Sequence, residues 1–135
     1  MTKSESTGRE RASSVGGTAP RSAAVSPADV LRKIPGAAGE RFAPAFRHGT
    51  LEVELCAPRG ADPQTPHRRD EAYVVVSGRG TFVHGGERTP FAPGDFLFVA
   101  AGVEHRFEAF DDDLAVWVLF YGPDGGERDA ESGTG

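Results

Sequence analysis

The chain has 135 residues, with 15 basic and 20 acidic side chains and a formal net charge of −5. This length predicts one domain, and the acidic balance argues against a nucleic-acid partner, which requires a basic face. No apolar run approaches the ~20 residues of a membrane helix, and no signal-peptide stretch stands at the N-terminus. A single cysteine cannot form an internal disulfide framework. We expect a cytoplasmic protein of one domain, without a membrane partner.

The N-terminal part is predicted to be a disordered arm followed by a short helix. Residues 1–25 contain no aromatic side chain and only two valines, so they cannot bury enough apolar surface to offset the chain entropy of folding. Ser26 can then cap a helix at about 27–34, with Pro27 in its first turn and Asp29 at its positive end.

The rest of the chain has the alternation and the turn signals of β-strands. Glycine and proline, 18 and 10 in number, separate strand-like segments that recur every ~10–15 residues. These segments are 51–55, 73–76, 81–83, 96–99, 105–110 and 114–121. They predict an all-β sandwich or barrel, which with the helix fills residues 26–122. The glycine-rich stretch 123–135 is predicted to be a flexible acidic tail.

Two stretches of the barrel carry side chains that can hold a metal ion. His67 and Glu71 lie four residues apart, which on a straight strand separates their Cα atoms by ~13 Å. A bend at 68–70 would instead end one segment at His67 and begin the next at Glu71, with both side chains aimed inward. His105 would then come from a distant strand. Two imidazoles and one carboxylate on one side of an ion leave positions open for substrate or oxygen; histidines with a purely structural role are the alternative.

These stretches resemble the two motifs of the cupin superfamily, whose fold is a double-stranded β-helix, or jelly-roll barrel. In the first motif, His67 is followed by three residues, Glu71, six residues and a glycine; in the second, Gly102 precedes His105 at the expected spacing. The resemblance covers roughly residues 50–121 and is that of a small single-domain bacterial cupin. It implies a metal ion held by His67, Glu71 and His105.

The sequence departs from the family motifs at three positions. Thr65 stands where the first histidine of the family's His-x-His pair would be, and a hydroxyl is a poor ligand. Ala100 and Ala109 replace the proline and the asparagine of the second motif. Gln64 is near enough to supply an amide oxygen, provided that the loop bends. Thr65 and Gln64 are therefore kept as additional site candidates.

The side chains expected around the ion follow from strand alternation. Tyr73 shares the parity of Glu71, and Phe107 shares that of His105, so both should face the barrel interior. Tyr73 is the candidate catalytic residue, as a hydrogen-bond donor or acid, with a plain core role as the alternative. Arg69, at the bend, could receive an anionic substrate or belong to a solvated basic turn.

The resemblance implies a mononuclear metalloenzyme that acts on a small oxygenated organic substrate, with dioxygenase, isomerase, cyclase and lyase chemistry all open. Fe(II) or Mn(II) is the favoured ion, with Ni(II) and Zn(II) as alternatives. The runner-up function is a non-catalytic cupin that binds or senses a small molecule, because Thr65 removes one ligand. The family also implies a homodimer.

Overall fold

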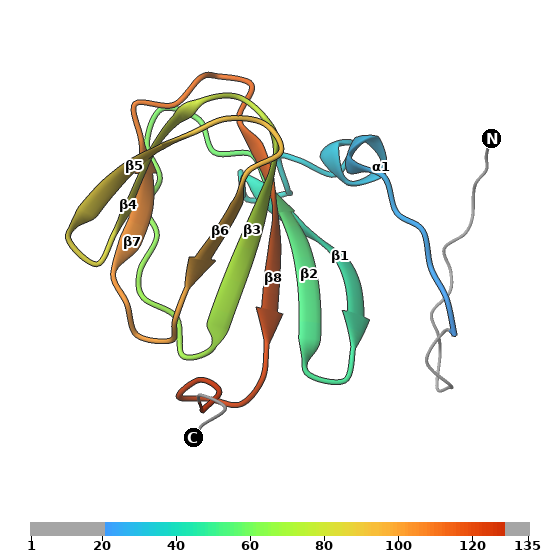
Figure 1. Cartoon of the computed structure of the whole chain (residues 1–135). Helices are drawn as coiled ribbons and strands as arrows, with labels where there is room; N and C mark the ends of the chain where they lie inside the picture. The colour runs from blue at the N-terminus through green and yellow to red at the C-terminus, as the bar shows by residue number, and fades with distance from the viewer. Residues whose placement is uncertain (1–20, 129–135) are drawn as a thin grey trace.

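The computed structural model describes residues 21–128, which form one short helix and two antiparallel sheets that face each other (Figure 1). The elements in chain order are α1 (Pro27–Leu31), β1 (Phe42–His48), β2 (Leu51–Cys56), β3 (Asp70–Ser77), β4 (Gly80–His84), β5 (Glu87–Phe91), β6 (Phe96–Val99), β7 (His105–Glu108) and β8 (Ala115–Tyr121). The larger sheet has the order β1-β2-β8-β3-β6 and the smaller one β5-β4-β7. This arrangement confirms the predicted all-β jelly-roll barrel. The described residues contain no helix with the length and apolar character needed to cross a membrane.

Helix α1 starts as predicted and ends earlier than predicted. The Ser26 hydroxyl accepts a hydrogen bond from the Asp29 backbone, and the Asp29 carboxylate accepts one from the Ser26 backbone, which closes a capping box. The helix ends at Leu31 instead of residue 34. Pro35 explains part of this difference, because a proline disfavours helical backbone in the residue before it.

Two strands, β1 and β5, were not predicted from the sequence. Each contains a proline, Pro44 in β1 and Pro90 in β5, and each lies at the edge of its sheet with one neighbour only. A proline is tolerated there, because an edge strand has backbone groups without a partner strand. Sequence alternation is weak in such strands, so they read as loops.

The barrel interior contains the aromatic and aliphatic side chains that strand parity placed there. Tyr73 and Phe107 are 1% and 2% exposed and belong to one buried cluster between the sheets. On strand β2, Leu55 packs outward with Val30 of α1, whereas Cys56 packs against the barrel cluster. The helix therefore covers the outer face of the larger sheet at β1 and β2 and leaves the interior to the site.

The two ends of the described chain differ in their contacts. Residues 21–25 contain no helix or strand, and the rest of the predicted arm, residues 1–20, lies outside the described residues. Residues 123–128, part of the stretch predicted to be a flexible tail, curl back beside the end of β8 (Figure 1). There Glu127 N donates to the Asp70 carboxylate and Gly125 N to the Arg68 carbonyl, so this segment braces the loop that carries the site. Residues 129–135 lie outside the described residues.

Candidate metal centre

Three side chains from the two motifs meet between the sheets. His67 lies in the loop that leads into β3, Glu71 is the second residue of β3, and His105 is the first residue of β7. The chain bends at residues 68 and 69, where the sequence predicted a bend. The second motif helps to hold this loop, because Gly102 N donates a hydrogen bond of 2.8 Å to the His67 carbonyl.

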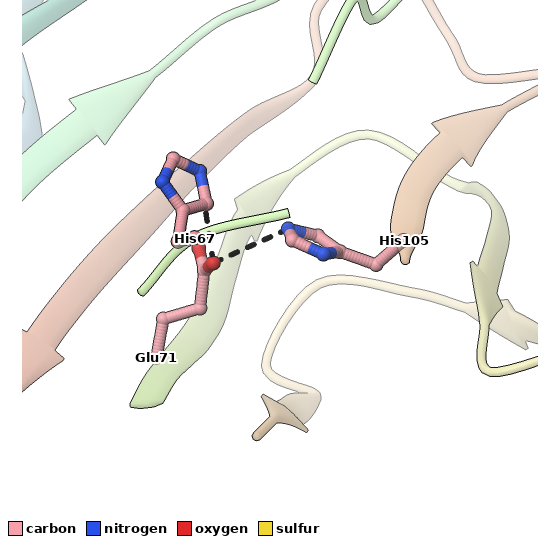
Figure 2. A group of neighbouring side chains, drawn as sticks. All are labelled: His67, Glu71 and His105. Carbon is pink, nitrogen blue, oxygen red and sulfur yellow. Dashed lines mark ion pairs between the residues drawn. The ribbon is translucent and has the colours of Figure 1, made fainter. Parts of the chain in front are cut away.

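One carboxylate oxygen is the centre of the group (Figure 2). Glu71 Oε1 lies 3.2 Å from His105 Nε2 and 3.7 Å from His67 Nε2. The Glu71 side chain is 1% exposed, and no group among residues 21–128 forms a hydrogen bond with this oxygen. Burial of a carboxylate oxygen without a hydrogen-bond donor costs free energy. A cation or a proton between this oxygen and the imidazoles would remove that cost.

The tautomer of His105 is set by the backbone. Its Nδ1 lies 2.9 Å from the Val103 carbonyl, which can only accept, so Nδ1 carries a proton. In the neutral ring Nε2 then presents its lone pair to Glu71. Burial lowers the pKa of His105, but the nearby Glu71 carboxylate and the Val103 carbonyl outweigh burial and raise the pKa above its ordinary value. A hydrogen bond from the ring nitrogen that does not bind the metal, here from Nδ1 to the Val103 carbonyl, is the usual way in which proteins orient a metal-binding histidine.

Tyr73 holds the other oxygen of Glu71. Its hydroxyl donates a 2.7 Å hydrogen bond to Glu71 Oε2. Burial, followed by the nearby Glu71 charge, raises the pKa of Tyr73, so the side chain is a neutral phenol. The phenol therefore fixes the carboxylate in the rotamer that aims Oε1 at the imidazoles. A direct role of Tyr73 on a substrate stays a prediction.

Gln64 reaches the group from the long loop between β2 and β3. Its Oε1 lies 3.2 Å from His105 Nε2 and 3.2 Å from the Tyr73 hydroxyl. The bend in this loop brings the amide inward, whereas Thr65, the next residue, is exposed. Asp62 accepts a hydrogen bond from Gln64 Nε2 and was missed by sequence reasoning, although its spacing of two from Gln64 in a proline-containing loop was a usable signal.

The spacing of these atoms fits a bound divalent ion. Ligand atoms at ~2.0–2.2 Å from an ion lie about 3–3.5 Å from one another in octahedral or tetrahedral geometry. The distances from Glu71 Oε1 to the two imidazole nitrogens, 3.2 and 3.7 Å, are close to this range. The three ligand atoms all lie within 4.8 Å of one another. Imidazole and carboxylate are also donors that first-row divalent metals accept.

Comparison with known proteins assigns the family. A family model described as "Cupin domain" matches residues 52–121, which is more than half of the chain. The chain belongs to the cupin family. An uncharacterized protein of Streptomyces coelicolor is 46% identical to this cupin over 59% of this chain and 97% of the relative.

Solved structures with this fold include three bacterial proteins. KdgF from a Halomonas species is 25% identical, covers 59% of this cupin and 76% of its own chain, and has a TM-score of 0.54. A cupin protein from Bacteroides fragilis is 22% identical, with coverages of 67% and 83% and a TM-score of 0.50. A cupin 2 conserved barrel domain protein from Salinispora arenicola is 20% identical, with coverages of 60% and 74% and a TM-score of 0.52. The last two likenesses show the fold alone.

The remaining candidates of this cupin fall into two groups. Phe107 lines the site indirectly, because its ring packs on Tyr73 with centroids 5.2 Å apart. Arg69 points away: its guanidinium donates to the Gly122 and Thr50 carbonyls and pairs with Glu52 at 3.3 Å. With its charge neutralised in this way, Arg69 braces the start of β2 and the end of β8. Neither Arg69 nor the exposed Thr65 is brought to the group.

Solvent reaches the centre of this cupin on the His67 side. The His67 side chain is 37% exposed, whereas those of Glu71 and His105 are 1% and 0% exposed. The His67 ring packs edge-on against Phe120, with centroids 5.0 Å apart. His67 and Phe120 therefore border the side of the centre that is open to solvent.

Proposed function

We propose that this cupin binds one divalent metal ion through His67, Glu71 and His105 and acts as a metalloenzyme on a small oxygenated organic substrate. The observation that carries the proposal is the buried Glu71 Oε1, which has no hydrogen-bond donor among the described residues and faces two imidazole nitrogens. Without an ion or a proton between Oε1 and an imidazole, the site would leave a buried charge uncompensated, which natural proteins rarely retain.

When bound, the ion would supply Lewis acidity and, with three protein ligands on one side, open positions for a substrate oxygen or dioxygen. The chain's own residues have three tasks. Tyr73 keeps the Glu71 carboxylate in place through its 2.7 Å hydrogen bond. The Val103 carbonyl keeps the proton of His105 on Nδ1. Phe107 and Phe120 provide apolar surroundings that exclude water from the inner side.

Fe(II) or Mn(II) is the ion that we propose, with Ni(II) and Zn(II) as alternatives, because two imidazoles and a carboxylate suit all four. Dioxygenase, isomerase, cyclase and lyase reactions are consistent with such a centre. The donor set does not choose among them, so the reaction class follows from assays once the ion is known.

The second candidate function is a cupin that binds a small molecule without chemistry. One observation favours it: the Tyr73 phenol, the expected acid, already donates to Glu71, and burial raises its pKa. A phenol in that state has no proton to give while it holds the carboxylate. Under this function, His67→Ala would leave the affinity for the small molecule unchanged.

Elemental analysis of the protein purified without chelator tests the proposal. We expect about one equivalent of metal in the wild type and a loss of it in both His67→Ala and His105→Ala. The matched control is His84→Ala, because His84 lies on β4 and its ring contacts Thr89 and Phe82 instead of the centre. Less than a tenth of an equivalent in the wild type, with no uptake of any of the four ions, would refute the proposal.

A further inference from the structure

We infer that Gln64 is a fourth ligand of the metal centre, through its amide oxygen, and that Asp62 is the positioning residue that turns this oxygen toward the ion. The inference rests on the proposed metal-binding function and deepens it. It explains how the site can compensate for the position of Thr65, where the family motif would have a histidine.

The orientation of the Gln64 amide follows from its partner. One end of the amide lies 2.8 Å from Asp62 Oδ2, which accepts hydrogen bonds and therefore requires the NH₂ group at that end. The opposite end is then the oxygen. This oxygen, Oε1, lies 3.2 Å from His105 Nε2. The rotated amide would place its oxygen against the Asp62 carboxylate and is disfavoured.

Asp62 is itself anchored to the strand that carries His105. The same oxygen, Oδ2, accepts a 2.8 Å hydrogen bond from the Phe107 backbone N–H. Strand β7 lies at the edge of its sheet and pairs only with β4, so this N–H has no strand partner on its open side. The bond ties the loop to β7 two residues from His105. The amide oxygen and the imidazole are thus held by one connected set of bonds.

No proton is left for Gln64 Oε1 in the neutral site. The Tyr73 hydroxyl lies 3.2 Å away, but its one proton goes to Glu71 Oε2, which is nearer at 2.7 Å. His105 Nε2 has only its lone pair when Nδ1 donates to Val103. Gln64 Oε1 therefore faces electron pairs, as Glu71 Oε1 does.

The two oxygens lie at the same distance from His105 Nε2. His105 Nε2 is 3.2 Å from Glu71 Oε1 and 3.2 Å from Gln64 Oε1. Such a spacing is that of neighbouring ligands around one divalent ion. An amide oxygen is a neutral ligand, so a fourth position filled by Gln64 adds no charge to the site.

The test is the equilibrium affinity of the full-length apo protein for Mn(II) and for Co(II), compared among variants. We expect Gln64→Ala to weaken both affinities by about 10- to 100-fold. Asp62→Ala should weaken binding by a similar factor, about 10- to 100-fold, the usual effect of removing a group that orients a ligand. Asp62→Asn, which keeps an acceptor for both donors, should restore it.

Thr65→Ala is the matched control, because Thr65 is the exposed neighbour of Gln64 in the same loop. It should bind as the wild type does. The visible absorption of the Co(II)-loaded protein gives a second readout, since it responds to the ligand set. We expect a changed spectrum for Gln64→Ala and an unchanged one for Thr65→Ala.

The outcomes separate this inference from the proposed function. Wild-type affinity and spectrum in Gln64→Ala, with metal still lost in His105→Ala, would overturn the Gln64 ligand and leave the proposed function standing. An equal loss in Thr65→Ala would also overturn it, because the loop as a whole would then be responsible. Loss in Gln64→Ala with full affinity in Asp62→Ala would overturn the role of Asp62. A wild type that binds neither ion would overturn the proposed function and this inference together.

Discussion

Removal of one hydroxyl, in Tyr73→Phe, should destabilise the metal-free protein by about 1.5–3 kcal/mol. The Tyr73 hydroxyl donates a 2.7 Å hydrogen bond to Glu71 Oε2, and both residues are 1% exposed, so water cannot replace the donor. A hydrogen bond to a charged group contributes about 1.5–3 kcal/mol, and a buried carboxylate that loses it has no compensation. The loss would leave both oxygens of Glu71 short of donors, since Oε1 has none already.

Urea unfolding in the presence of a chelator measures this effect. With a slope of about 1–3 kcal/mol per M, the midpoint should fall by roughly 1 M. Tyr121→Phe is the matched control, because it removes the same atom from a half-buried residue whose hydroxyl forms no hydrogen bond within residues 21–128. It should change the free energy of unfolding by less than about 0.5 kcal/mol. Equal effects of the two substitutions would refute the idea that Tyr73 holds the carboxylate.

Three further predictions concern the rest of the molecule. Gly78→Ala should lower the free energy of unfolding by about 1–3 kcal/mol more than Gly86→Ala does, as measured by thermal or urea unfolding. Both glycines have φ of +88°, but only at Gly78 would the new Cβ meet backbone, 2.6 Å from Leu114 Cα. The Cys56 thiol should react with a thiol reagent at neutral pH only after unfolding, because burial and the nearby Glu54 raise its pKa; rapid labelling of the native protein would contradict this. Sedimentation should give twice the mass of one chain, as the expected homodimer requires, and a monomer at all concentrations would contradict it.

Most of what the sequence could predict about the site came from the spacing of residues in the two motifs. His67, Glu71 and His105 come together because each stands at a fixed place relative to a strand start, and period-two alternation then put Tyr73 on the same face as Glu71. The bend at residues 68 and 69 was predictable because a straight strand would have kept His67 and Glu71 apart. Local rules were sufficient for the bend and for the parity of Tyr73, whereas the meeting with His105 was implied by the family resemblance.

The features that escaped prediction depend on partners far along the chain. Asp62 accepts a hydrogen bond from the Phe107 backbone, 45 residues along the chain, so the local spacing of Asp62 and Gln64 could suggest the pair but not its anchor on β7. The alternation of β2 was visible, but it did not show which face points inward: Leu55 packs outward against α1, while Cys56 on the opposite face packs into the barrel. An apolar strand face that a helix covers outside the barrel gives the same alternation as one that points inward.

The position of the ion is the most direct test of the proposed metal centre. Crystals of the protein loaded with Fe(II) or Mn(II), measured on either side of the metal absorption edge, would locate it by anomalous scattering. We expect one peak per chain, at about 2.0–2.3 Å from His67 Nε2, Glu71 Oε1 and His105 Nε2. An empty site in crystals soaked with each ion, or a peak that contacts none of these three atoms, would contradict it.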